Sequence, residues 1–148
     1  MTNNVVRLRQ QDRVFAAPIL TDDLDTFIPL ARKLLEKAVK RQDRNLDMND
    51  VISDLYAGRS ALWLVYIGDT LVAAITTSVV RHPRRSTLFI EFVGGSRLKE
   101  WMEYVIGMFV HVAKDAGLDG IETDGRKGFE RIYPETFKIT HSHYEMEF

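Results

Sequence analysis

The feature that most constrains the fold of this chain is a strand, glycine, helix, strand succession over residues 87–127. An apolar segment at residues 87–93 meets a Gly-Gly-Ser corner, then a long amphipathic segment, then a second apolar segment at residues 118–123. Two parallel strands joined by a crossover helix need about this length of chain. Glycines at the strand end let backbone amides approach a ligand at the helix N-terminus, where the helix dipole favours anions. The pattern therefore predicts a corner suited to a phosphate-bearing cofactor.

Composition favours a globular protein of one domain. A chain of 148 residues can bury a core, and its 45% hydrophobic and 28% charged residues argue against disorder. It lacks the roughly 18 consecutive apolar residues of a membrane span and a signal-peptide pattern, so we expect no membrane association and a cytoplasmic location. The absence of cysteine excludes disulfides and a cysteine nucleophile. A net charge of -1 argues against general nucleic-acid binding.

Two helices are predicted before this unit. Apolar residues recur at three- and four-residue spacing over residues 24–38, which is the helical period. A second helix is predicted over residues 49–57, with Asp47 or Asn49 as its cap and Gly58 as its end.

Strands are predicted on either side of these helices. The first strand is either residues 5–9 or residues 14–19, and residues 61–67 and 70–80 form a hairpin about a Gly-Asp turn. After the crossover unit we expect a short helical turn and a final strand at residues 137–148. The order β-α-α-β-β-β-α-β-α-β predicts an α/β (α+β) fold, a mixed, mostly antiparallel sheet with helices on both faces. The final strand has edge character, which permits a homodimer by strand exchange.

This order of elements resembles that of the GCN5-related N-acetyltransferase (GNAT) superfamily over nearly the whole chain. The segments EFVGG at residues 91–95 and GRKGF at residues 125–129 are similar, more closely, to those of small GNAT-like proteins of tailed bacteriophages. The resemblance implies a single GNAT-like domain over residues 1–148. It also implies transfer of an acetyl group from acetyl-CoA to the amine of a small molecule or a protein.

The resemblance further implies which residues form the site. Glu91, which interrupts an apolar strand, would be the base that takes the ammonium proton, and Tyr133 the acid that protonates the departing thiolate. The pyrophosphate of acetyl-CoA would lie at the start of the long helix. The expected cofactor-binding residues are Phe92, Val93, Gly94, Gly95, Ser96, Arg97 and Arg126.

Each of these residues also has a simpler interpretation, which the sequence leaves open. Glu91 can lie on the less buried face of the sheet or pair with a basic residue, because a buried unpaired carboxylate is costly. Tyr133 can pack at the end of a helix. The pair Gly94 and Gly95 can form only a tight turn, and Arg126 can cap the surface of a loop.

The glycine corner departs from the family pattern, and this departure keeps a second function open. Family members usually carry Gln/Arg-x-x-Gly-x-Gly/Ala, whereas residues 94–99 here read GGSRLK without spaced glycines. The alternative is a phage-encoded GNAT-fold protein without catalytic activity that acts as a virion component or binds a host protein. Its location would then be the host cytoplasm or the virion.

Two further groups of residues carry weaker signals. His141 and His143 share one face of the final strand, as two metal ligands do, but no third ligand has the required spacing, so no metal site is predicted. A basic loop favours a solvated surface over a nucleic-acid site, because no aromatic residues are interleaved. It comprises Arg81, His82, Arg84 and Arg85.

Overall fold

A single sheet forms the centre of the protein in the computed structural model, which describes residues 13–42, 46–124 and 146. Within these residues, five strands lie in the order β1-β2-β3-β4-β5. Successive strands are antiparallel except the last pair, which is parallel. They are β1 (Val14–Ile19), β2 (Ala61–Ile67), β3 (Thr70–Arg81), β4 (Ser86–Gly95) and β5 (Gly120–Thr123). The predicted mixed, mostly antiparallel sheet is confirmed, and residues 14–19 form β1.

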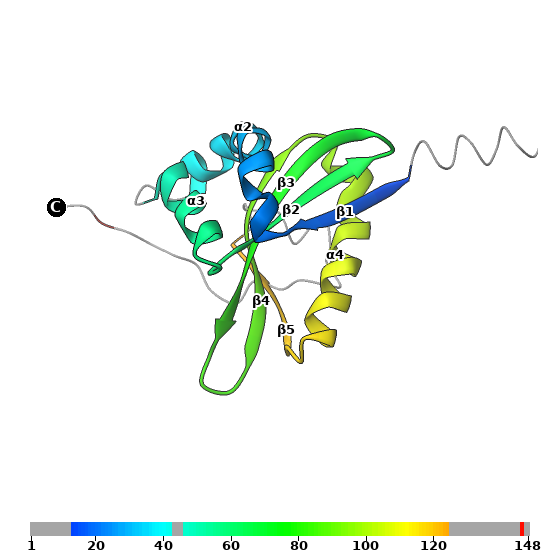
Figure 1. Cartoon of the computed structure of the whole chain (residues 1–148). Coiled ribbons are helices and arrows are strands. Elements are labelled where there is room, and N and C mark those ends of the chain that lie inside the picture. Colours follow the sequence, from blue (N-terminus) through cyan, green and yellow to red (C-terminus); the bar gives the residue numbers. More distant parts are fainter. Residues whose placement is uncertain (1–12, 43–45, 125–145, 147–148) are drawn as a thin grey trace, which may run out of the picture.

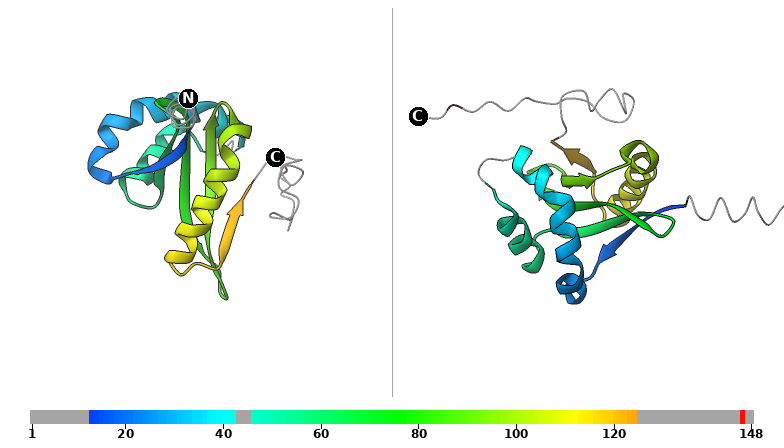
Figure 2. Two further views of the ribbon diagram at one scale, coloured as in Figure 1. Left: turned by 90° about the vertical axis from the view of Figure 1, so that its right-hand side faces the viewer. Right: turned by 90° about the horizontal axis from the view of Figure 1, so that it is seen from above.

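Helices cover both faces of this sheet (Figure 1). A short 3-10 turn, η1 (Thr21–Asp23), leads into α2 (Leu24–Gln42), which is followed by α3 (Met48–Tyr56). Helix α4 (Leu98–Asp115) connects β4 to β5. Seen from above, in the right panel of Figure 2, α2 and α3 lie on one side of the sheet and α4 on the other. No helix in this described part is long and apolar enough to cross a membrane.

Each face of the sheet has its own apolar core, because β2 and β3 are buried on both sides. In β2, Trp63 and Val65 pack toward α4, whereas Leu62 and Leu64 pack toward α2 and α3. Burial of each such side chain contributes about 1.5–3 kcal/mol relative to exposure. The two cores hold the three layers in one arrangement.

Helix α3 begins and ends one residue earlier than predicted, and its cap is Asp47, one of the two residues that the sequence offered. The Asp47 side chain accepts a bond from the Asp50 amide at 3.1 Å, and the Asp50 side chain accepts one from the Asp47 amide at 3.0 Å. This reciprocal capping box satisfies amides that have no partner inside the helix. After the helix, Gly58 adopts a φ of 75°, a left-handed conformation that glycine accommodates without strain. The turn directs the chain into β2.

Strand β4 is longer than predicted. It continues through Gly94 and Gly95, which lie opposite Ala74 and Ala73 of β3, whereas the sequence predicted an end at Val93. The glycines were expected to break the strand, but pairing with β3 keeps them in the sheet. The predicted helical turn and final strand after Asp124 lie outside the described residues.

Candidate functional site

A β-bulge in β4 marks the centre of the candidate site. Thr76 lies opposite Phe92 and Thr77 lies opposite Ile90, so Glu91 is the extra residue of β4. A bulge bends its strand and redirects side chains. Ile90 belongs to the core beneath α4, whereas Phe92 belongs to the core beneath α2 and α3. The bulge therefore switches β4 from one face to the other at Glu91.

Glu91 is half-buried and contacts the turn that follows α3. Its Oε1 accepts a hydrogen bond from the Ser60 Oγ at 2.7 Å. Burial raises the pKa of Glu91; the Ser60 hydrogen bond opposes this shift, and the negative charge of Asp54 adds to it. This hydrogen-bond partner is a hydroxyl group and not the basic residue that the simpler interpretation expected. A half-buried carboxylate with a raised pKa is a suitable proton acceptor.

Next to Glu91, the pairing between β4 and β5 ends. The two strands pair from Thr87 and Gly120 to Ile90 and Thr123. The Thr123 hydroxyl donates to the Ile90 carbonyl oxygen at 3.1 Å, and in the described residues β4 continues without a β5 partner. An apolar pocket of about 20 Å³ lies at this point beneath α4, lined by Ile75, Ile90, Val93, Met102, Val105, Ile106, Phe109 and Thr123. The last residue of β4 that pairs with β5, Ile90, thus directly precedes Glu91.

The two glycines of the corner are required by close packing. A β-carbon at Gly94 would lie 1.9 Å from the carbonyl oxygen of Leu34 in α2. At Gly95, where φ is 142°, it would lie 2.2 Å from the carbonyl oxygen of Val72 in β3. The Ser96 amide also donates to Val72 O, at 2.9 Å. Packing against α2 and β3 therefore explains the pair, in place of the tight turn that was one of the two interpretations of the sequence.

Within the corner, the backbone segment best suited to bind an anion starts at Arg97. This residue is left-handed, with φ 59° and ψ 34°, and the helical residues of α4 follow it directly. Such a change of hand makes successive amides converge. The Glu100 amide donates to the Arg97 carbonyl oxygen at 2.9 Å, so the first-turn amides that could meet an anion are those of Leu98 and Lys99. The Trp101 Nε1 donates to the Ser96 carbonyl oxygen at 2.8 Å and holds this turn in place. The Arg97 guanidinium bonds Glu100 at 2.6 and 2.9 Å.

The predicted site residues are therefore brought together in part. Phe92 is buried, so its backbone and not its side chain is available to a ligand, and Val93 lines the small apolar pocket. Arg126 and Tyr133 lie outside the described residues, as do His141 and His143. Sequence reasoning missed Ser60, which lies 31 positions from Glu91 and has no motif to mark it.

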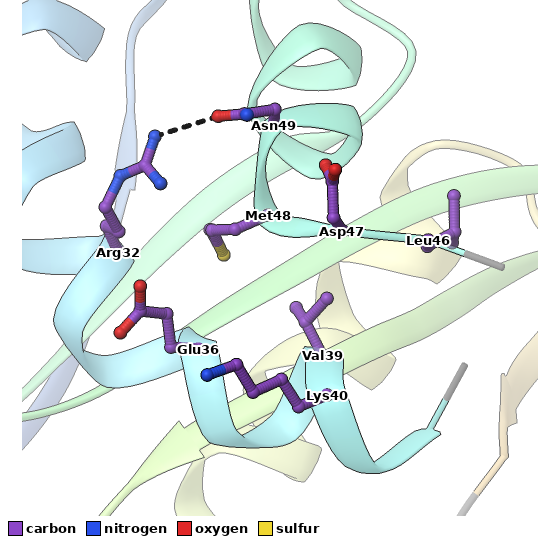
Figure 3. A pocket seen from close by; sticks show the side chains of 8 residues that line it. All are labelled: Arg32, Glu36, Val39, Lys40, Leu46, Asp47, Met48 and Asn49. Carbon is purple, nitrogen blue, oxygen red and sulfur yellow. Dashed lines mark hydrogen bonds between the residues drawn. The ribbon is translucent and has the colours of Figure 1, made fainter. Parts of the chain in front are cut away.

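A larger hollow of about 260 Å³ lies between α2 and α3, at the opposite end of α3 from Ser60 (Figure 3). Its lining alternates in charge, and Arg32 donates to Asn49 Oδ1 at 3.2 Å across it. Glu36 and Lys40 project from neighbouring turns of α2. None of the predicted site residues lines the hollow.

The basic loop forms the exposed tip of the β3–β4 hairpin, which extends beyond α2 and α3 (Figure 1). His82 Nε2 lies 2.6 Å from Glu122 Oε1 of β5, and Arg81 donates to Ser86 Oγ at 3.4 Å. Part of the loop is thus engaged with its own hairpin and with β5, in agreement with a solvated surface.

Comparison with solved structures identifies the architecture. A possible acetyltransferase from Clostridium difficile 630 superimposes with a TM-score of 0.63 at 19% identity, over 91% of this chain and 97% of that one. A ribosomal-protein-alanine N-acetyltransferase from Brucella melitensis biovar Abortus 2308 gives 0.64 at 16% identity, over 92% and 99%. This chain has the GNAT fold. A predicted acetyltransferase with acetyl-CoA, from Clostridium acetobutylicum, also shares the GNAT fold, with a TM-score of 0.64 at 13% identity over 91% and 96%.

Sequence comparisons find no relative, in contrast to the comparison of folds. No protein-family model matches the chain, and no curated protein sequence matches it. The predicted GNAT fold is confirmed at the level of architecture. The comparisons give no support to a bacteriophage origin, so the phage part of the resemblance stays a prediction.

Proposed function

We propose that this GNAT-fold protein transfers an acetyl group from acetyl-CoA to an amine, with Glu91 as the general base. The observation that carries the proposal is the bulge that places a half-buried carboxylate of raised pKa one residue beyond the last β4–β5 pair. Structural neighbours with acetyltransferase names, one of them with acetyl-CoA, support it.

The backbone at the start of α4 fits the pyrophosphate of acetyl-CoA. The amides of Leu98 and Lys99, which follow the left-handed Arg97, supply converging donors at the positive end of the helix dipole. Acetyl-CoA would supply the activated acetyl group. Its pantetheine arm, which carries two amide groups between short apolar segments, suits the place where β5 leaves β4, beside Val93.

In the proposed reaction, Glu91 accepts a proton from the acceptor ammonium, which frees the nitrogen lone pair for attack on the thioester carbonyl carbon. The new C–N bond forms as the C–S bond breaks. Tyr133 remains the residue predicted to protonate the departing thiolate. General base catalysis by a positioned carboxylate contributes about 10²–10⁴-fold to such a rate.

Calorimetry tests this function directly. Titration of the full chain with acetyl-CoA should give saturable heat, and an amine panel should give thiol release that depends on Glu91. No heat at millimolar acetyl-CoA would remove the proposal.

A second candidate function is a binding protein that keeps the GNAT fold without the chemistry. The observation that favours it is the glycine corner. Backbone atoms of α2 and β3 occupy the space beside Gly94 and Gly95, and the Ser96 amide donates to the Val72 carbonyl oxygen. A virion component or a binder of a host protein, as predicted from the phage resemblance, belongs to this class. Its test is a stable complex in a pull-down combined with the absence of acetyl-CoA binding.

A further inference from the structure

Ser60 occupies a fixed position opposite the carboxylate of Glu91. Its amide and that of Arg59 donate to the Asp54 carbonyl oxygen at 3.2 and 3.0 Å, and the Gly58 amide donates to the Leu55 carbonyl oxygen at 3.2 Å. These bonds tie the turn to the last part of α3. The main chain of Ser60 is therefore fixed at a position from which its hydroxyl reaches Glu91.

The hydrogen bond between the two side chains has a defined direction. A carboxylate only accepts, so the Ser60 Oγ donates its single proton to Glu91 Oε1, at 2.7 Å. Donors to a carboxylate stabilise its charged form. Within residues 13–42 and 46–124 no hydrogen bond engages the second oxygen of Glu91, Oε2, which in the proposed reaction takes the proton of the acceptor amine.

In the part of the chain that the structure describes, other charges near Glu91 either disfavour its negative charge or are already paired. Asp54 of α3 is negative and disfavours a second negative charge, while Arg59 pairs with Asp54 at 2.8 Å. On the β5 side, Glu122 lies opposite Phe89 and is bonded to His82. Among the described residues, Ser60 is thus the group that opposes the effect of burial and Asp54 on the pKa of Glu91, in part.

We propose that Ser60 is a positioning residue for acyl transfer, which holds Glu91 in its charged form with Oε2 directed to the acceptor amine. The inference rests on the proposed function. No bond forms or breaks at Ser60: its proton stays on Oγ, and the ammonium proton moves to Glu91. The residue acts through Glu91 and does not itself touch the substrate.

The test compares Ser60→Ala with Ser60→Thr and with Ser53→Ala, which removes an exposed hydroxyl from α3. In Ser60→Ala, NMR titration of labelled glutamate carboxyls should show a higher pKa for Glu91. The acidic limb of the pH profile of kcat/KM should move to higher pH in parallel. On that limb kcat/KM should fall about tenfold, through a lower kcat more than through a higher KM. Ser60→Thr should restore both readouts, and Ser53→Ala should leave them unchanged.

An unchanged Glu91 titration and an unchanged pH profile in folded Ser60→Ala would overturn the role of Ser60. Equal shifts of the Glu91 titration in Ser60→Thr and Ser60→Ala would also overturn this role, because the hydroxyl would then not be the responsible group. Absence of acetyl transfer by the native chain would instead overturn the proposed function, and the NMR titration separates these two failures.

Discussion

Gly94 of β4 lies directly against Leu34 of α2, so that a β-carbon at position 94 would be 1.9 Å from the Leu34 carbonyl oxygen. The obstacle is backbone, which cannot rotate away as a side chain can. We expect Gly94→Ala to force α2 from the sheet and to lower the free energy of unfolding by about 2–3 kcal/mol. Urea denaturation of the variant and the native chain measures the difference.

Gly107 provides the matched control for this prediction. It lies in α4 with no atom within 4 Å of its would-be β-carbon. Gly107→Ala should therefore stabilise the protein by about 0.5–1 kcal/mol, since alanine loses less backbone entropy in a helix. Equal effects of the two substitutions would show that α2 is not packed on β4 at Gly94.

The glycine pair shows what the sequence could and could not reveal. Local patterns predicted the strands, the helices and the cap of α3, because each depends on neighbouring residues. The same reasoning assigned Gly94 to the end of a strand, since nothing near it in the sequence indicates that Leu34 crosses it. A close approach between segments 60 positions apart becomes visible only in the folded chain.

Replacement of Glu91 by glutamine should abolish most of the acetyl transfer. Glutamine keeps the shape and can still accept the Ser60 hydrogen bond, but it cannot take a proton. We expect kcat to fall by about 10²-fold or more while the affinity for acetyl-CoA is retained. Glu103→Gln, an exposed change on α4, is the control. Full activity of Glu91→Gln would assign the base to another residue.

The same substitution should raise stability at neutral pH. Burial raises the pKa of Glu91 in the folded state above its unfolded value, so the folded state binds more protons. The contribution of Glu91 to stability is therefore complete at low pH and is lost as the pH rises through its folded pKa. In thermal melts across this range, the melting temperature of Glu91→Gln should increase relative to that of the native chain as the pH rises. A difference that does not change with pH would contradict the raised pKa of Glu91.

The sequence indicated candidate site residues such as Glu91 and Arg97, but not the contacts and the backbone geometry around them. Glu91 stood out because a carboxylate interrupts an apolar strand. Its partner Ser60 and the bulge that redirects Glu91 had no signal, because both depend on the register between strands. The left-handed Arg97 was hidden for a related reason: non-glycine residues rarely adopt this conformation, so the sequence does not indicate it.

The cap of α3 makes a prediction that is independent of function. Asp47→Ala removes the acceptor for the Asp50 amide and should cost about 1 kcal/mol of unfolding free energy. Asp47→Asn keeps an acceptor oxygen and should cost much less. Chemical denaturation of both variants measures this, and equal losses would indicate that the charge of Asp47 and not the cap is what stabilises α3.

The start of α4 can be tested as an anion site through Ser96, which is exposed and whose side chain is not needed for packing. Ser96→Asp places a carboxylate beside the first-turn amides, where it stabilises the helix but repels a pyrophosphate. We expect the Kd for acetyl-CoA to rise about tenfold, with the effect reduced by salt, and Ser96→Ala to bind as the native chain does. Position 95 would not serve, because any side chain there meets Val72. Calorimetry that finds equal affinity for the aspartate and alanine variants would show that the pyrophosphate binds elsewhere. The thioester would then have to reach Glu91 from a different direction.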